Sequence, residues 1–181
     1  MPRQRKKLLI VDGYNVLRSG SRYRNLTDPD YTDDAFNRAR ETLINDVINY
    51  AGREWHAIIV FDGGRNRFST GETETVGGVR IMFSPAGSSA DKVIEKLAHD
   101  ARERMIETLV VSSDATIQDT VFGGGVDRMS ANGFSHEVDL YYADAKLDET
   151  PKVAKKSTVA SRIDPDTLAK LVALRDRGSR S

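Results

Sequence analysis

Short apolar runs alternate with stretches of helical periodicity along this chain. The runs lie at residues 8–11, 57–61, 79–83 and 108–111, and each is followed by polar or turn-forming residues. Apolar runs of about four to eight residues that end in such turns are typical of buried strands. We therefore predict four short strands.

The stretches between these runs carry apolar residues at the spacing of a helix. One helix is predicted to begin at Thr32 or Asp33 and another at residues 88–89, because these positions hold good capping residues. A short helix is expected after Asp114, and a longer one over residues from about 130 to 146. Strands that alternate with helices indicate an α/β fold with a mostly parallel sheet covered on both faces.

Two regions have a less regular pattern. Residues 63–78 are rich in glycine, threonine and charge, which predicts a mobile loop or a loose hairpin. Residues 148–163 are polar and are interpreted as a linker that follows a domain over residues 1–147. Residues 164–181 are predicted to form a terminal helix and a tail, because an Asp-Pro pair suits the start of a helix.

Composition narrows the class of protein. A length of 181 residues suits one well-cored domain, and the absence of cysteine excludes disulfides and favours a reducing, cytoplasmic setting. No apolar run approaches the roughly 20 residues of a membrane span, so no membrane partner is expected. The 27 Lys and Arg balance the 27 Asp and Glu, so nucleic-acid binding would depend on the local distribution of charge.

Carboxylates follow three of the four predicted strands. Asp12, Asp62 and Asp114 stand at or just beyond strand ends. In an open parallel sheet the carboxyl ends of neighbouring strands meet at one edge, where ligands bind. Asp91 lies in the first turn of the helix predicted at residues 88–89, and Glu95 lies one turn later on the same face. These acids are therefore predicted to converge.

Such a cluster has a definite chemical consequence. Converging carboxylates repel one another unless a proton or a cation neutralises them. Oxygen ligands without histidine or cysteine select Mg²⁺ or Mn²⁺, and two such ions about 4 Å apart support phosphodiester hydrolysis. Each acid also has a plainer interpretation, because Asp-Gly after a strand is a common turn and an aspartate at a helix start is a common cap.

Four polar or aromatic neighbours of the acids have two interpretations each. Asn15 could orient a carboxylate or a metal-bound water, or it could be an ordinary turn residue. Ser112 and Ser113 could do the same, or they could cap the helix that follows. Tyr14 could stack on a base or pack against the sheet. The sequence leaves these alternatives open.

Basic and aromatic side chains near the acids could hold RNA. Phosphate contacts by arginine and lysine supply affinity without sequence readout, and an aromatic ring among them could stack on an unpaired base. The alternative is a solvated loop in which nearby glutamates offset the arginines. The candidates for RNA contacts are Arg65, Arg67, Phe68, Arg80 and Lys92.

Four blocks of sequence, taken in order, resemble the YacP-like NYN-domain proteins over about residues 7–147. The first block is fairly specific, and the others are specific only as an ordered set. The blocks are Val11-Asp12-Gly13-Tyr14-Asn15-Val16, Val60-Phe61-Asp62-Gly63, Ser89-Ala90-Asp91-Lys92-Val93-Ile94-Glu95 and Ser112-Ser113-Asp114.

The resemblance implies a three-layer α/β/α fold of the PIN-like nuclease group with an acidic site for divalent metal. Carried over by motif, Asp12, Asp91 and Asp114 are implied as the metal-binding catalytic acids and Asp62 as a fourth ligand. Members of the family are endoribonucleases, and one branch associates with the ribosome and cuts messenger RNA during translation.

We therefore predict a divalent-metal-dependent endoribonuclease that hydrolyses single-stranded RNA, with messenger RNA and the ribosome as implied partners. Two alternatives stay open. One is a nuclease-like fold that binds RNA or a ribosome without cutting. The other is a nuclease that acts on DNA, because carboxylate–metal chemistry does not itself read the sugar.

Overall fold

A computed structural model describes residues 6–26, 33–63, 71–149 and 170 of the chain. It divides into two units, residues 1–139 and 140–181, and all the strands belong to the first. No helix in the described part of the chain is long and apolar enough to cross a membrane. The strands are β1 (Lys7–Asp12), β2 (Trp55–Phe61), β3 (Thr73–Val76), β4 (Val79–Phe83), β5 (Thr108–Val111) and β6 (Val126–Met129). The helices are α1 (Gly13–Ser19), α2 (Asp33–Ala51), α3 (Ala90–Glu103), α4 (Ala115–Val121) and α5 (Ala131–Glu149).

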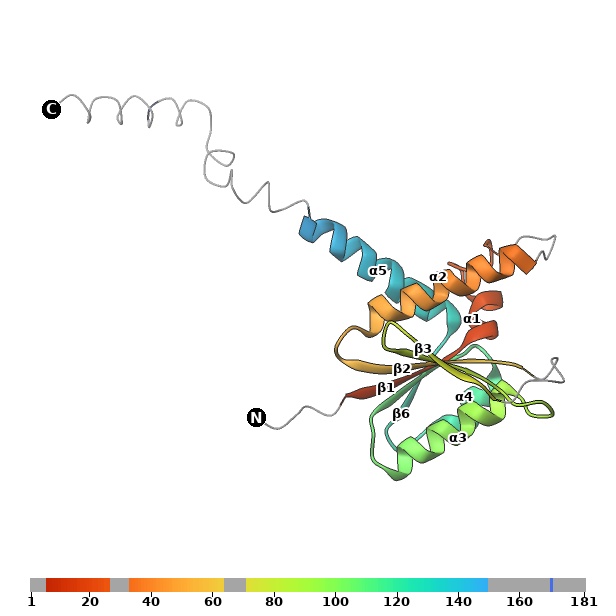
Figure 1. The fold of residues 1–181 in the computed structure, drawn as a ribbon. Helices are drawn as coiled ribbons and strands as arrows, with labels where there is room; N and C mark the ends of the chain where they lie inside the picture. The colour runs from red at the N-terminus through yellow and green to blue at the C-terminus, as the bar shows by residue number, and fades with distance from the viewer. Residues whose placement is uncertain (1–5, 27–32, 64–70, 150–169, 171–181) are drawn as a thin grey trace. The chain divides into compact units, whose positions relative to one another are not determined.

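The strands form one six-stranded sheet in the order β3-β4-β2-β1-β5-β6. Every neighbouring pair is parallel except β3 and β4. Helices α3 and α4 cover one face, and α1 and α2 cover the other (Figure 1). The four strands predicted from apolar runs are β1, β2, β4 and β5, so the prediction of an α/β fold with a mostly parallel sheet is confirmed.

The hairpin alternative for residues 63–78 is confirmed in the part that the structure describes. β3 pairs antiparallel with β4, and Val76 is in register with Val79. Gly77 and Gly78 between them have φ values of 57° and 84°. A two-residue turn with positive φ at both positions matches the twist of the flanking strands and favours glycine.

Two elements were not predicted. β6 follows three consecutive glycines and carries exposed Asp127 and Arg128, so it lacks an apolar run, yet it pairs in parallel with β5. α1 begins at Gly13, directly after the last residue of β1, so no linker separates the strand from the helix. Both elements are short and depend on pairing or packing with neighbours that lie far away in the sequence.

Alternation along the strands divides the core in two. Ile10, Val60 and Val110 lie in the core beneath α3 and α4, packed with Ile94 and Ile117. Burying one such side chain stabilises the fold by about 1.5–3 kcal/mol relative to leaving it exposed. Successive strand residues point to opposite faces, so the residues between them face α1 and α2. This alternation fixes the direction of the polar side chains at the strand ends.

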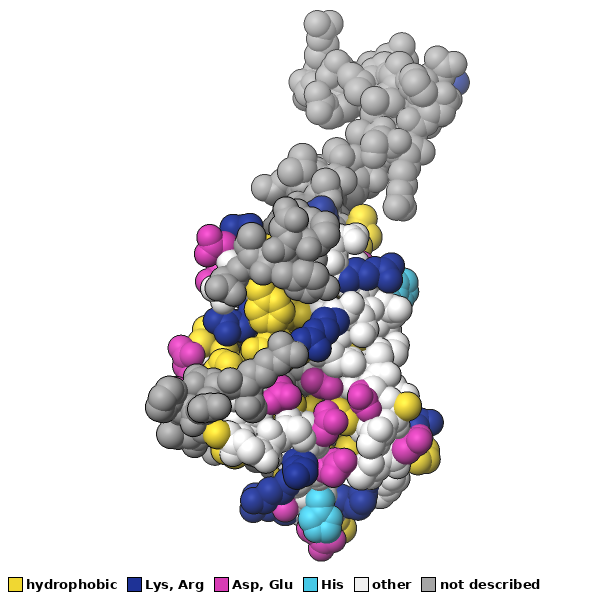
Figure 2. Space-filling model, turned by 90° about the vertical axis from the view of Figure 1, so that its right-hand side faces the viewer, with side chains coloured by type: hydrophobic (Ala, Val, Ile, Leu, Met, Phe, Trp, Pro, Cys, Tyr) yellow, Lys and Arg dark blue, Asp and Glu magenta, His cyan; other side chains and the backbone are white. Residues whose placement is uncertain are grey.

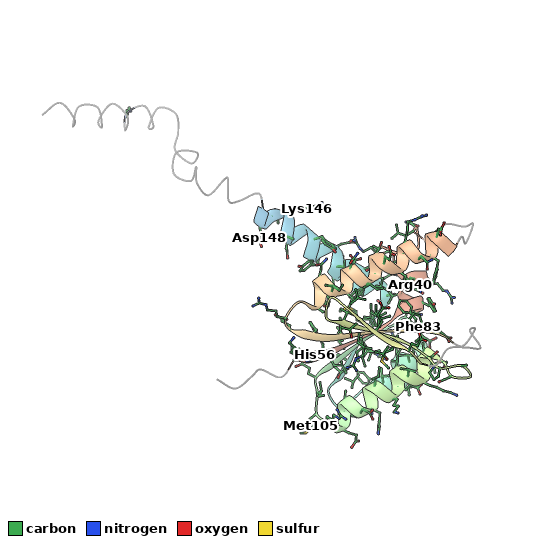
Figure 3. The ribbon with its side chains drawn as sticks, viewed as in Figure 1. Arg40, His56, Phe83, Met105, Lys146 and Asp148 are labelled. Carbon is green, nitrogen blue, oxygen red and sulfur yellow. The ribbon has the colours of Figure 1, made fainter. Side chains whose placement is uncertain are left out.

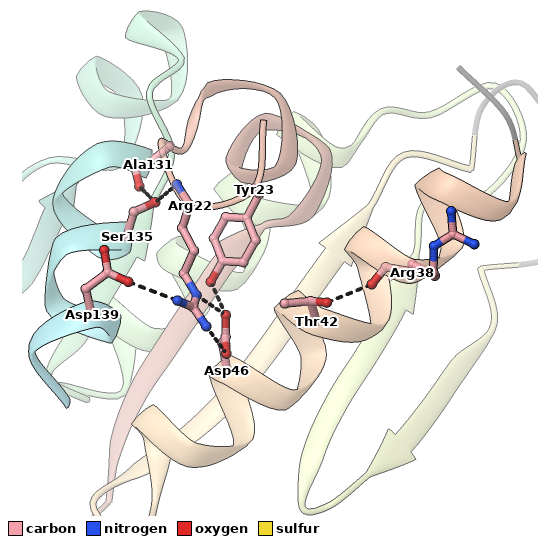
Figure 4. A network of polar contacts seen from close by, with 8 residues as sticks. All are labelled: Arg22, Tyr23, Arg38, Thr42, Asp46, Ala131, Ser135 and Asp139. Carbon is pink, nitrogen blue, oxygen red and sulfur yellow. Dashed lines mark hydrogen bonds and ion pairs between the residues drawn. The ribbon is translucent and has the colours of Figure 1, made fainter. Parts of the chain in front are cut away.

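A polar network joins the segment after α1 to α2 and to the first half of α5. Arg22 Nε donates to Asp46 Oδ2 at 2.7 Å, and its Nη1 donates to Asp139 Oδ1 at 2.9 Å (Figure 4). The Tyr23 hydroxyl donates to Asp46 Oδ2 at 2.8 Å, and Tyr23 and Asp46 are both buried. Burial, followed by the neighbouring Asp46 charge, raises the pKa of Tyr23, so the phenol stays protonated and remains a donor.

Candidate metal and nucleic-acid site

Three polar side chains extend one face of the sheet beyond its carboxyl edge. Asp12, Asp62 and Ser112 each stand two residues after a core residue beneath α3 and α4, namely Ile10, Val60 and Val110. A spacing of two along a strand direction keeps side chains on the same face. Because β1 is paired with both β2 and β5, these three positions lie at the end of, or directly after, adjacent strands.

Asp12 is a buried carboxylate with only 6% of its surface exposed. The Ser112 hydroxyl donates to Asp12 Oδ2 at 2.9 Å. Burial, which is the largest cause, and the nearby Asp91 and Asp114 charges together raise the pKa of Asp12 to about 6, against the lowering effect of the Ser112 hydrogen bond. Ionised Asp12 is therefore held at an energetic cost, which a bound cation would offset.

Helix α3 places Asp91 at the same carboxyl edge of the sheet. It lies in the first turn of α3, and the Ser89 hydroxyl that caps this helix accepts from Lys92 N at 3.4 Å. Burial raises the pKa of Asp91, and the charges of Asp114, Glu95 and Asp62 raise it further. The acids predicted to converge therefore lie close enough for the charge of one to raise the pKa of another.

The view onto the carboxyl edge shows the result on the surface. Figure 2 looks at the side that lies on the right in Figure 1, and a group of acidic side chains occupies the middle of this face, with basic side chains on either side of it. Within the described residues, none of the ion pairs involves Asp12, Asp91 or Asp114. These three acids therefore have no neutralising side chain among the described residues.

Asp62 and Asp114 have structural contacts as well. Asp62 Oδ1 accepts from the Ser84 hydroxyl at 3.2 Å. Asp114 is the N-cap of α4, and its Oδ1 accepts from Thr116 N at 2.8 Å and from Ile117 N at 3.3 Å. The capping interpretation thus holds for one oxygen of Asp114. Its second carboxylate oxygen has no hydrogen bond among the described residues.

The neighbouring polar residues fix the loops that carry the acids. Asn15 Oδ1 accepts from Ser113 N at 2.7 Å, which ties α1 to the segment after β5. Ser112 Oγ accepts from Asp114 N at 3.1 Å while its hydroxyl binds Asp12, so one side chain positions two acids. Ser113 Oγ accepts from Ala131 N at 2.9 Å and so caps α5. These three residues act by positioning their neighbours.

The donor set fits a hard divalent cation. Among the described residues, no three Asp, Glu, His or Cys side chains are grouped closely enough to form a ready-made metal site. Mg²⁺ binds through only one or two carboxylates and keeps several waters, so it does not require such a cage. The raised pKa values of Asp12 and Asp91 indicate carboxylates that lack a compensating positive charge. Oxygen donors of this kind suit Mg²⁺ or Mn²⁺ better than zinc.

The residues predicted to hold RNA are only partly described. Lys92 is exposed on the first turn of α3, and Arg80 is exposed on β4, three residues before its carboxyl end. Arg65, Arg67 and Phe68 lie outside the described residues. Lys92 is thus the described candidate that stands beside an acid in sequence.

Two residues of the site were missed by the sequence reasoning. Ser84 is completely buried, and its hydroxyl oxygen accepts from Gly63 N at 2.9 Å while it donates to Asp62. Gly13 lies against the Phe61 ring, which a Cβ at this position would overlap. The Asp-Gly pair after β1 is therefore more than a turn, since Gly13 lets α1 approach β2. Both roles depend on contacts between segments far apart in the sequence, namely Gly13 with Phe61 and Ser84 with Asp62.

The chain resembles known proteins of one family in both sequence and fold. A Bacillus subtilis (strain 168) protein described as uncharacterized protein YacP is 29% identical over 132 residues, which cover 73% of this chain and 75% of that protein. The crystal structure of a mutant of Rae1 (YacP) from Bacillus subtilis superposes with a TM-score of 0.59 at 26% identity, covering 92% of this chain and 90% of that one. A further crystal structure of Rae1 (YacP) gives a TM-score of 0.61 at 24% identity, with 96% of each chain covered, and supports the fold.

A family model extends the likeness along nearly the whole chain. The model for the YacP-like NYN domain matches residues 9–176. NYN domains are in general nuclease-like and of the PIN-like kind, in agreement with an acidic edge on a parallel sheet. The chain therefore belongs to the YacP-like NYN-domain family.

Proposed function

We propose that this protein is a divalent-metal-dependent endoribonuclease that hydrolyses single-stranded RNA at the acidic edge of its sheet. One observation carries the proposal. Asp12, Asp91 and Asp114 come from three segments far apart in the sequence, yet the charges of Asp91 and Asp114 raise the pKa of Asp12, Asp114 also raises that of Asp91, and none of the three has an ion-pair partner among the described residues. A protein gains no stability from bringing like charges together in this way, which indicates a function for them.

The chain contributes position and negative charge. Ser112 holds Asp12 in place, α3 presents Asp91, and the capping contacts of Asp114 leave one of its oxygens available. These three acids, with Asp62 as a fourth, would hold Mg²⁺ or Mn²⁺. When bound, the ion would lower the pKa of water and offset the charge that develops on the leaving oxygen.

Hydrolysis at this site would have a recognisable product. Attack of water on a backbone phosphate leaves a 5′-phosphate and a 3′-hydroxyl. A histidine-driven ribonuclease passes instead through a 2′,3′-cyclic phosphate. In the described structure His56 is the second residue of β2 and lies at the edge of the sheet opposite the acids. The pKa shifts of Asp12 and Asp91 involve no histidine. We propose the first chemistry, with messenger RNA in the cytoplasm as the natural substrate.

The test is cleavage of a long, unstructured, 5′-labelled RNA by the full chain in Mn²⁺, in Mg²⁺ and in EDTA. We expect cutting with either ion and none in EDTA. Asp12→Asn and Asp91→Asn should each reduce the rate at least about a hundredfold, because each removes a charged oxygen ligand. Glu103→Gln removes an exposed acid at the far end of α3 and is the matched control, with an expected rate equal to that of the unaltered chain.

Three outcomes decide between the candidates. Cutting that persists in EDTA, or in both Asn variants, would overturn the metal site. Absence of cutting on free RNA, followed by cutting of messenger RNA in a translation extract, would identify a ribosome-dependent enzyme. Absence of cutting in both settings, with RNA still bound, would support the binding module that does not cut.

A further inference from the structure

A second surface borders the acids, on the side of the sheet covered by α1 and α2. Tyr14 follows Asp12 by two residues and Phe61 directly precedes Asp62, so both lie within about 7 Å of an acid along the backbone. In Figure 3, Arg40 and Phe83 are labelled towards the right-hand side, which is the side that faces the viewer in Figure 2. There an apolar surface flanked by basic side chains adjoins the acidic group. The aromatic–arginine patch consists of Tyr14, Phe36, Phe61, Phe83, Arg18 and Arg40.

The rings of the patch form a continuous series. The Tyr14 centroid lies 5.2 Å from that of Phe36 and 5.0 Å from that of Phe61. Phe61 and Phe83 are 5.6 Å apart and nearly parallel, with an angle of 26° between their planes. Phe61 is completely buried, whereas Tyr14, Phe36 and Phe83 are only partly buried. The partly buried rings leave aromatic surface exposed beside the acids.

Two arginines lie over these rings. Arg18 Cζ is 5.9 Å from the centroid of Tyr14, and Arg40 Cζ is 6.0 Å from that of Phe61. Within the described residues neither guanidinium has a hydrogen bond or an ion pair, unlike that of Arg22, which is bound by two aspartates. A guanidinium stacked on a ring keeps its N–H edge available for the oxygens of a phosphate.

An acidic site needs positively charged side chains beside it if its substrate is a polyanion. Phosphates are repelled by uncompensated carboxylates, and positive charge beside the site offsets this repulsion. Aromatic faces add base stacking, which is open only to unpaired bases. Two rings of the patch, Tyr14 and Phe61, lie within two residues of Asp12 and Asp62, and the two arginines stack on these same rings. A patch that served only to pack α1 against the sheet would not require two unpaired arginines over its rings.

We propose that the aromatic–arginine patch binds an unpaired stretch of the RNA substrate and directs its backbone to the adjacent acids. This inference rests on the proposed function, which it deepens by assigning the single-stranded substrate a binding surface. Arg18 and Arg40 contact phosphates, and Tyr14, Phe36 and Phe83 contact bases. The preference for single strands then comes from stacking, since the phosphate contacts are equally open to a duplex.

The experiment measures binding without cleavage. Full-length protein carrying Asp91→Asn is titrated in EDTA against a fluorescent, unstructured RNA of about twelve nucleotides, and against the same strand in a duplex, by anisotropy. Arg18→Ala with Arg40→Ala should weaken single-strand binding about tenfold or more and reduce the slope of log affinity against log salt by about 1.4. Phe36→Leu keeps an apolar side chain but cannot stack, and should weaken binding of the single strand about fivefold and of the duplex hardly at all.

Matched controls stand at the other edge of the sheet. Arg53→Ala removes an exposed arginine before β2, and Phe122→Leu removes an exposed ring before β6; neither should change binding. Arg18→Glu, on an exposed side chain, serves if the double variant does not fold by circular dichroism. Equal affinities for patch and control variants would overturn the proposal, as would equal weakening of duplex and single strand by Phe36→Leu.

The readout separates this proposal from the nuclease assignment. If the patch variants lose binding while the unaltered chain cuts no RNA with any ion, the patch stands and the nuclease fails. If the chain cuts RNA but patch and control variants bind alike, the nuclease stands and the patch fails.

Discussion

Two buried aspartates in this domain have opposite surroundings. Asp46 in α2 is 2% exposed and receives hydrogen bonds from the Arg22 guanidinium and the Tyr23 hydroxyl. Asp12 at the end of β1 is 6% exposed and faces Ser112 and two further acids, Asp91 and Asp114. A buried charge that is fully partnered supports the fold, whereas one that is surrounded by like charges costs stability. The comparison separates a structural aspartate from one retained for chemistry.

The largest effect is expected at the partnered aspartate. Asp46→Asn removes the charge that Arg22 and Tyr23 bind, so we expect the free energy of unfolding to fall by about 2–3 kcal/mol. Equilibrium unfolding in urea measures it. Asp139→Asn removes the other carboxylate that contacts Arg22, but its side chain is 57% exposed, so a loss of at most about 1 kcal/mol is expected. Equal losses in the two variants would contradict the distinction.

The opposite sign is expected at Asp12. Its pKa is about 6 in the folded chain against a usual value near 3.8, so the folded state binds the proton more tightly. Ionisation above pH 6 therefore costs at most about 3 kcal/mol of stability, and the cost disappears as the pH falls towards 4. In EDTA at about pH 7.5, Asp12→Asn should raise the free energy of unfolding by about 1–2 kcal/mol, allowing for a weaker bond to Ser112.

Urea unfolding at about pH 7.5 and about pH 4.5 checks this sign. The gain from Asp12→Asn should be present at the higher pH and small at the lower one. Asp100→Asn, which changes an exposed acid on α3, should give no such pH-dependent gain. A variant that is less stable than the unaltered chain at both pH values would show that Asp12 supports the fold.

The smallest effect is expected from added metal, and it depends on the proposed site. Mn²⁺ at about ten times its dissociation constant should stabilise the folded chain by about 1.4 kcal/mol, which raises Tm by about 3–6 °C. Thermal unfolding with and without Mn²⁺ measures the shift. Asp91→Asn should lose most of it and Glu103→Gln should retain it. An unchanged shift in Asp91→Asn would remove that residue from the ligand set.

Parts of this structure could be predicted from the sequence because their signal is local. The apolar runs at β1, β2, β4 and β5 need no knowledge of the fold, and an aspartate after such a run can be recognised directly. β6 could not be recognised, because its middle residues, Asp127 and Arg128, are polar and it is a strand through its pairing with β5. The role of Gly13 was hidden for a similar reason, since it depends on the Phe61 ring of another strand.

The candidate site divides in the same way. The sequence contained the order of the acids and the alternation that directs Asp12 and Asp62 to one face. It did not contain the aromatic–arginine patch, whose members come from α1, α2, β2 and β4. No spacing in the chain predicts that Arg40 will lie over Phe61, because that contact exists only once α2 has packed on the sheet.

The sequence by itself thus determined the α/β class, four of the six strands and the acids at their carboxyl ends. Hydrophobic periodicity and the direction of parallel strands are sufficient for these features, since both act over a few residues. Only the tertiary structure decided which aspartate is compensated and which is not. Burial and the distance between charges arise from segments far apart in the chain, and they separate Asp12 from Asp46 where residue type cannot.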